Sequence, residues 1–62
     1  MEKANQDIRE YAKKNGVFHW QIGDKFGVND VSFSRWMRHE FSPEKKAQAL
    51  RYIDEIVREK NV

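Results

Sequence analysis

The chain has 62 residues, no cysteine and a formal net charge of +2, so we expect one small domain, residues 1–62, without disulfides. Charged residues make up 35% and aromatic residues 13% of the sequence, which excludes a disordered chain and a membrane-spanning one. No signal-peptide pattern opens the sequence, and two histidines without thiolates make a poor zinc site, so we expect a cytoplasmic protein stabilised by helix packing or self-association.

Two helices are predicted in the N-terminal half of the chain. The first is expected over residues 5–15, with Asn5 as its cap and Gly16 at its end. Its apolar side chains recur at helical spacing: Ala4, Ile8, Tyr11 and Ala12. The second is expected over residues 18–26, and its inward face is predicted to contain Val17, Phe18, Ile22 and Phe26. Trp20 lies just beside this face, so it either covers the first or fourth helix or stays exposed. We prefer core packing over a stacking platform for single-stranded nucleic acid.

A tight connection and a third helix follow. Gly27 is free to adopt a positive φ, and Asn29 suits the cap of a helix over residues 30–39. The inward face of this helix is predicted to carry Phe33, Trp36 and Met37. Its outward face is polar, small and partly basic, and consists of Asp30, Val31, Ser34, Arg35 and Arg38.

One long helix is predicted over residues 43–60. Ser42 is a capping residue, Pro43 suits the first helical position, and Glu44 favours the positive end of the helix dipole. A single apolar stripe runs along the helix: Ala49, Leu50, Ile53, Ile56 and Val57. The predicted fold is therefore all-α, a four-helix, bundle-like domain without strands or repeats.

The second and third helices satisfy the spacing rules of a helix-turn-helix. Gly23 supplies a small residue where the two helices approach, and its cost of about 1 kcal/mol in a helix interior asks for such a packing reason. Gly27 follows at the turn and Val28 closes the corner, while Phe33 and Trp36 face inward.

With these residues in place, the segment from Val17 to Glu40 resembles the lambda-repressor-like family of phage-repressor domains. It is also similar to short single-domain regulators of phages and mobile elements. The matching string is VFHWQIGDKFGVNDVSFSRWMR, and its strongest parts are Phe26-Gly27-Val28 and Phe33-Ser34-Arg35-Trp36. The resemblance implies a recognition helix that enters the major groove of double-stranded DNA. It departs from the family at His19 and Asp30, where the family commonly has Gln.

Five residues are candidates for contacts with DNA bases. Arg35 lies in the middle of the outward face, where a guanidinium can donate two hydrogen bonds to guanine. Ser34 and Asn29 can contact a base edge or a phosphate, and Val31 can meet a thymine methyl group. Asp30 either caps the third helix, which we prefer, or accepts a hydrogen bond from a cytosine amino group.

Further residues are candidates for contacts with DNA phosphates, which position a protein without reading sequence. They are His19, Lys25, Arg38, Lys45 and Lys46. The segment from Lys13 to Lys46 holds seven bases and four acids, and its formal charge of +3 favours a polyanionic partner. A solvated surface can have the same composition, so that alternative stays open.

The apolar stripe of the fourth helix is wide enough for both the core and a second chain. Helix-turn-helix proteins commonly bind two half-sites as dimers, so the candidates for a homodimer interface are Leu50, Ile53, Ile56 and Val57. No nucleophile motif and no phosphate-binding glycine run occurs, so we expect no catalytic residue, no metal, no cofactor and no small-molecule ligand.

The expected function is sequence-specific binding of double-stranded DNA, with transcriptional regulation of a phage or mobile element as its result. Two alternatives remain. An architectural, excisionase-like protein would bend DNA for a recombinase. A protein-interaction module would keep the fold without affinity for DNA, and the acids Asp30 and Glu40 favour it.

Overall fold

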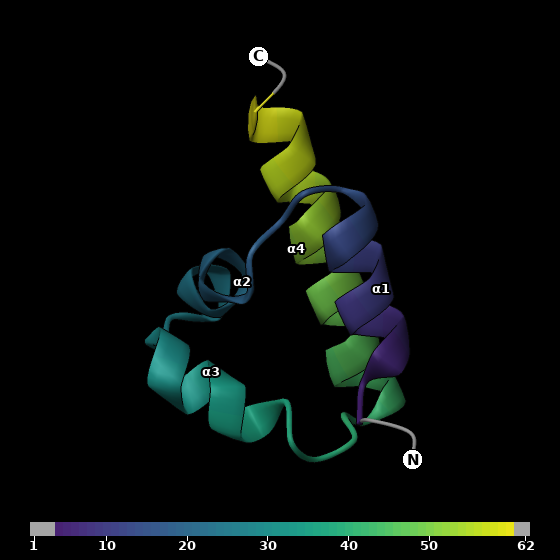
Figure 1. Cartoon of the computed structure of the whole chain (residues 1–62), viewed down its shortest axis with the longest axis vertical. Coiled ribbons are helices and arrows are strands. Elements are labelled where there is room, and N and C mark those ends of the chain that lie inside the picture. The colour runs from purple at the N-terminus through teal and green to yellow at the C-terminus, as the bar shows by residue number, and fades with distance from the viewer. Residues whose placement is uncertain (1–3, 61–62) are drawn as a thin grey trace.

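The computed structural model describes residues 4–60 and shows four α-helices and no strand within that range. They are α1 (Gln6–Lys14), α2 (His19–Phe26), α3 (Asp30–Trp36) and α4 (Pro43–Lys60). The long α4 lies beside α1 with the N-terminal ends of both at the same end of the molecule, α2 packs against α4, and α3 packs against α2 (Figure 1). The prediction of an all-α chain with four helices is confirmed for this part of the chain.

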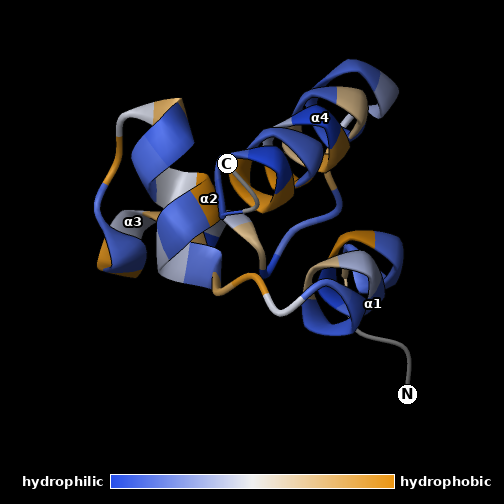
Figure 2. Ribbon diagram, turned by 90° about the horizontal axis from the view of Figure 1, so that it is seen from above, coloured by the Kyte–Doolittle hydropathy of each residue, from blue (hydrophilic) through white to orange (hydrophobic). Residues whose placement is uncertain are grey.

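The core lies where the helices face one another, as the orange segments of α1, α2 and α4 show in Figure 2. Ile8, Ile22, Phe33 and Ile53 have no exposed surface, and fully burying such a side chain stabilises the fold by roughly 1.5–3 kcal/mol. The ring of Phe33 joins α3 to this core, with its centroid 5.9 Å from that of Phe26. α3 is therefore anchored through one buried aromatic residue.

The beginning of α3 is placed by its close crossing with α2. A Cβ atom on Gly23 would lie 2.9 Å from the Cβ of Phe33, so only glycine allows this approach, as predicted. Gly27 ends α2 with a φ of 82°, and the Val28 amide donates to the Gly23 carbonyl at 2.9 Å. The Asn29 side chain accepts from the Ser32 amide at 2.8 Å and caps α3, which confirms that prediction.

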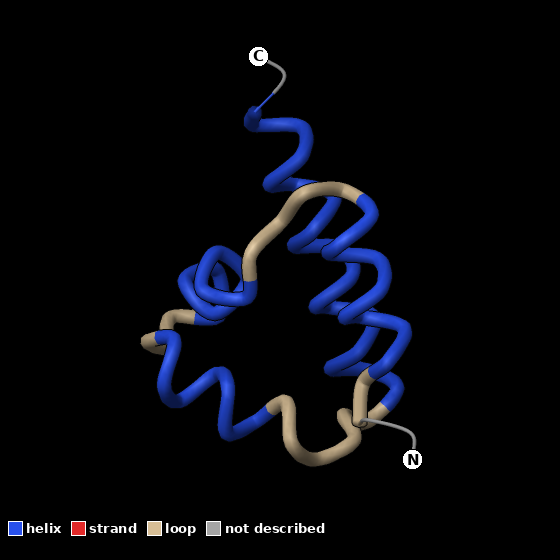
Figure 3. The backbone as a smooth tube through the Cα atoms, in the orientation of Figure 1, coloured by secondary structure: helices blue, strands red, loops and turns tan. Residues whose placement is uncertain are grey.

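The end of α3 is placed by Asn5, a residue far away in the sequence. Asn5 is fully buried with a φ of 58°, and its side-chain amide donates to the carbonyls of Met37 at 3.2 Å and His39 at 2.8 Å. Its side-chain oxygen accepts from the Phe41 amide at 2.7 Å. Figure 3 shows the loop after α3 reaching the N-terminal end of α1, where these bonds form. Asn5 occupies the N-cap position of α1, as predicted, but its side chain makes no capping bond to that helix, because it bonds to the loop after α3.

A second set of polar contacts surrounds Asn5. Its backbone amide donates to the Glu40 carboxylate at 2.8 Å, and Lys46 pairs with Glu40 and, at 3.3 Å, with Asp7. The bond from Asn5 and then the bond from Lys46 lower the pKa of Glu40. Arg9 adds a bond to the Met37 carbonyl at 3.1 Å. The loop after α3 is therefore tied to α1 through both backbone and side-chain groups.

Three predicted boundaries shift in the structure. The first helix covers residues 6–14 and not 5–15, and the second begins at His19, because Phe18 has an extended backbone. The third ends at Trp36 and not at residue 39, because the amides of Arg38 and His39 bond to carbonyls only three residues back. The fourth has the predicted bounds, and the Lys45 amide donates to the Ser42 hydroxyl at 3.3 Å, which confirms the cap.

Two aromatic residues lie outside the core, contrary to prediction. Phe18 is 63% exposed and Trp20 is 55% exposed. Trp20 precedes the buried Ile22 by two residues, which is slightly more than half a helical turn, so it points away from the face that α2 packs into the core. No helix between residues 4 and 60 has the length and apolar character needed to cross a membrane.

Candidate nucleic-acid interface

The outward side of α3 is a narrow exposed surface, which we name the α3 face and define by Asp30, Val31, Ser34 and Arg35. All four side chains are exposed. Successive residues of an α-helix rotate by about 100°, so Asp30 and Ser34 share one edge, Arg35 lies at the other, and Val31 lies between them. Arg38 is also exposed but follows the end of α3.

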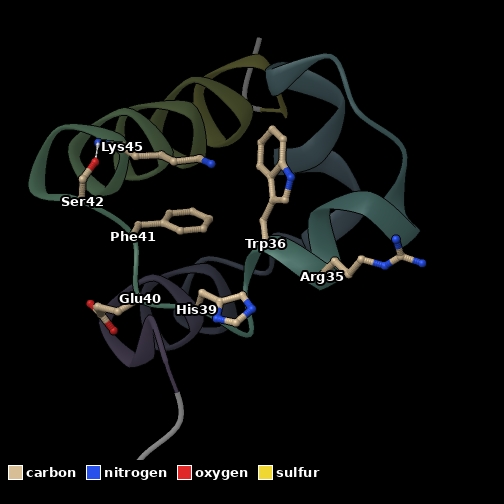
Figure 4. A pocket seen from close by; sticks show the side chains of 7 residues that line it. All are labelled: Arg35, Trp36, His39, Glu40, Phe41, Ser42 and Lys45. Carbon is tan, nitrogen blue, oxygen red and sulfur yellow. Dashed lines mark hydrogen bonds between the residues drawn. The ribbon is translucent and has the colours of Figure 1, made fainter.

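Arg35 keeps its guanidinium free for a ligand. Four ion pairs are found among residues 4–60, and the cation in each of them is Lys25 or Lys46. Arg35 therefore takes part in none of them. Figure 4 shows its side chain extended away from Trp36, Phe41 and Lys45. All five of its N–H donors are thus available to an external acceptor.

A hollow of about 430 Å³ borders the Arg35 edge of the α3 face (Figure 4). The ammonium of Lys45 lies 3.7 Å from the ring centroid of Trp36 and 4.8 Å from that of Phe41. Such cation–π contacts contribute roughly 0.5–1 kcal/mol at exposed sites. They hold Lys45 over the hollow that Arg35 also lines, so the α3 face has two cations along this edge, and we name it the basic edge.

The other predicted phosphate contacts are less available. Lys25 on α2 pairs with Glu59 at 2.9 Å and with Glu55 at 3.9 Å, and the bond to Glu59 raises the pKa of Lys25. Lys46 pairs with Glu40 and Asp7. Both lysines thus connect helices within the chain, and their charges are largely neutralised where they stand.

His19 lies in surroundings that favour its neutral form. It is half-buried, with its ring centroid 6.2 Å from that of Phe33, and burial, followed by the charge of Arg9, lowers its pKa. A neutral imidazole still donates one hydrogen bond, so His19 could contact a phosphate without adding charge.

The capping residue of α3 is Asn29 and not Asp30. Asp30 is the first residue of the helix, and no hydrogen bond of its carboxylate is found within residues 4–60. The preferred interpretation of Asp30 as a cap is therefore wrong. Asn29 retains its side-chain N–H groups for an external acceptor, because capping uses only its oxygen.

The four residues predicted to form a dimer interface on α4 differ in how far they are buried. Ile53 is 0% and Ile56 is 5% exposed, so both belong to the core of the single chain. Leu50 and Val57 pack against the core and keep partial exposure. A second chain on α4 would therefore meet Leu50 and Val57 and not the two isoleucines.

A second hollow, of about 550 Å³, borders the opposite edge of the α3 face. It lies between α1, α2 and α3, and we name it the Trp20 hollow after the exposed ring on its wall. Its lining includes Phe18, Trp20, Lys13, Asp30 and Ser34. The sequence did not predict this hollow, because Phe18 was expected to face inward and core packing was preferred for Trp20. The offset of Trp20 from the buried face of α2 was the available signal.

The residues between 4 and 60 bring no three histidine or acidic side chains together as a metal site. Comparison of the chain with known protein families, with curated proteins and with solved structures gives no match. A function is therefore inferred from the residues and their geometry.

Proposed function

We propose that this chain binds double-stranded DNA and that α2 and α3 form a helix-turn-helix whose α3 face enters the major groove. The observation that carries the proposal is the guanidinium of Arg35, which forms no ion pair with residues 4–60 and lies on an exposed, largely polar helix face. The major groove is about 12 Å wide and admits one α-helix. The glycine-mediated crossing of α2 and α3 supports the same arrangement.

We assign each residue of the α3 face its own contact with a DNA base. Arg35 donates two hydrogen bonds to guanine, Ser34 contacts a base edge, and Val31 meets a thymine methyl group. With capping assigned to Asn29, the carboxylate of Asp30 is left to accept from a cytosine amino group. Such contacts supply specificity, each good bidentate pair contributing about 1–3 kcal/mol of discrimination.

Phosphate contacts come from the basic edge. Arg38 is exposed just beyond α3, and Lys45 is held over the adjoining hollow by Trp36. Lys25 and Lys46 stay in their pairs within the chain. Because few cations are involved, we expect a modest dependence of affinity on salt, roughly one power of salt concentration for each phosphate neutralised.

A transcriptional regulator is the biological role we propose, on the resemblance of residues 17–40 to short regulators of phages and mobile elements. The position of α3 is fixed at its beginning by Gly23 and at its end by Asn5. A recognition helix that is held in place before binding supports a protein that recognises a specific DNA sequence.

The test is selection from a pool of random duplex DNA at low and moderate salt. The comparison is between the wild-type chain, Arg35→Ala and the control Arg51→Ala, which removes an exposed arginine of α4. We expect a defined motif that Arg35→Ala loses and Arg51→Ala keeps. A motif that survives Arg35→Ala, or the absence of any motif, would contradict base reading by α3; motif-free binding would favour the architectural role.

A further inference from the structure

Two of the three large apolar side chains that are exposed within residues 4–60 line one hollow. Phe18 is 63%, Trp20 is 55% and Val31 is 62% exposed. Phe18 and Trp20 line the Trp20 hollow, whereas Val31 lies on the α3 face next to the edge formed by the lining residues Asp30 and Ser34. Isolated apolar residues are normal on a protein surface, but a gathered patch marks an interaction site.

The hollow combines apolar walls with cations at its rim. Val17 and Ala12 are buried at its base, and Lys13 is exposed and forms no ion pair with residues 4–60. Arg9 is held in place because its guanidinium donates to the carbonyls of Ala4 at 2.9 Å and Met37 at 3.1 Å. The volume of about 550 Å³ lies within the range of sites that accept several apolar groups.

We infer that the Trp20 hollow is a docking site for a segment of a partner protein that carries apolar side chains next to a carboxylate. The apolar side chains pack against Phe18 and Trp20, and the carboxylate pairs with Lys13 beside Arg9. Tryptophan and arginine are the residues that most often dominate the binding free energy of protein interfaces. The two cations of the hollow select an acidic segment over a basic one.

The charges of the hollow also favour an acidic protein segment over two other occupants, a single nucleic-acid strand and a second copy of this chain. A single nucleic-acid strand needs a row of cations along its backbone. The hollow offers Arg9 and Lys13, and Asp30 opposes them. A second copy of this chain, placed hollow to hollow, would bring both pairs of cations together with only the two Asp30 carboxylates to balance them. An acidic segment meets neither obstacle.

Docking at this hollow has a consequence for DNA. Asp30 and Ser34 line the hollow and belong to the α3 face, so a docked segment covers one edge of the surface that we propose reads bases. Partner and duplex should then compete. This consequence rests on the proposed function, whereas docking itself does not, and docking is measured without DNA.

The experiment is selection from a random-peptide display library on the full chain, followed by affinity measurements with the enriched peptides as synthetic probes. We expect enriched peptides with Phe, Leu or Trp beside Asp or Glu. Their affinity should fall by about tenfold or more with Trp20→Ala. It should also fall with Lys13→Glu and remain unchanged with Arg51→Ala. Since Trp20 and Lys13 are exposed, these variants should fold, as circular dichroism would verify.

Several outcomes overturn the inference. These are no enriched peptide, peptides without acids that bind Lys13→Glu equally well, and affinity that is unchanged in Trp20→Ala. Two further measurements address the other occupants. Oligothymidylate binding that is tighter than that of any selected peptide, and that quenches tryptophan fluorescence in the wild-type chain but not in Trp20→Ala, would assign the hollow to single-stranded nucleic acid. A concentration-dependent dimer in sedimentation that Trp20→Ala abolishes would assign it to a second copy.

Discussion

The two ends of α3 are held by different kinds of contact. Its beginning depends on neighbours in the chain: Gly23 allows α2 to approach, Gly27 makes the turn, and Asn29 caps the helix. Its end depends on Asn5, whose side chain bonds to residues 32 to 36 positions later. The helix that we propose reads DNA thus has one end placed by local geometry and the other by a single buried side chain.

The largest expected effect is the loss of the remote anchor. Asn5→Ala leaves the buried Phe41 amide without its partner, at about 1–3 kcal/mol, and removes the part-buried bond to the His39 carbonyl. It also places alanine at a φ of 58°, which adds about 1–2 kcal/mol. We expect the free energy of unfolding, measured with urea, to fall by about 3 kcal/mol or more.

Asn5→Gly separates the two causes, because glycine tolerates the positive φ but makes no side-chain bonds. We expect it to be destabilised, yet less than Asn5→Ala. An unfolding free energy of Asn5→Ala within about 0.5 kcal/mol of wild type would show that Asn5 does not anchor α3.

A substitution at the crossing of α2 and α3 should destabilise the fold less than the loss of Asn5. Gly23→Ala brings a Cβ to 2.9 Å from the Cβ of Phe33, and overpacking of this kind costs about 1–3 kcal/mol. Alanine recovers about 1 kcal/mol of helix propensity, so we expect a net loss of about 1 kcal/mol by urea unfolding. Asp24→Ala, at an exposed position of the same helix, is the control. Equal stability of both variants would contradict a tight crossing.

The cap of α3 should matter to a similar or smaller extent. Asn29→Ala removes the acceptor for the Ser32 amide, and we expect a loss of about 1 kcal/mol in thermal or urea unfolding. Asn29→Asp retains an acceptor and should remain close to wild type. If both substitutions weaken the fold equally, the capping bond is not the cause.

The smallest expected effect is a change in how the stability of the fold depends on acidic pH. Because bonds from Asn5 and Lys46 lower the pKa of Glu40, its carboxylate stabilises the fold above the ordinary glutamate pKa of about 4.3. This stability is lost as the pH falls through the lower pKa of the folded state. Glu40→Gln keeps an acceptor for the Asn5 amide but cannot titrate, so its melting temperature should fall less steeply with acid. An identical slope in both proteins would remove Glu40 from the acid response.

The sequence predicted the parts of the fold whose causes are local. Four helices, the bounds of α4, the Gly23 crossing and the Asn29 cap all follow from spacing within a few residues. The sequence predicts Asn5 at the cap of α1 but not its side-chain bonds to the loop after α3, because a short polar side chain suits both a helix cap and a buried residue at positive φ.

The sequence predicted which residues form the α3 face, but it did not predict the ion pairs and exposed aromatic rings that surround this face. The α3 face is exposed as expected. The pairing of Lys25 and Lys46 depends on which helices lie next to each other, and no local pattern shows this. The exposure of Trp20 was missed because an aromatic residue near an apolar face was assumed to be buried.

The most direct test of the central proposal is an NMR titration of the ¹⁵N-labelled protein with the duplex enriched by selection. If α3 reads DNA, the largest amide shifts should fall on Asp30 to Arg38, with a second group at Lys45. Shifts confined to the outer surface of α4, or no shifts in the presence of the duplex, would contradict a DNA-reading role for the α3 face.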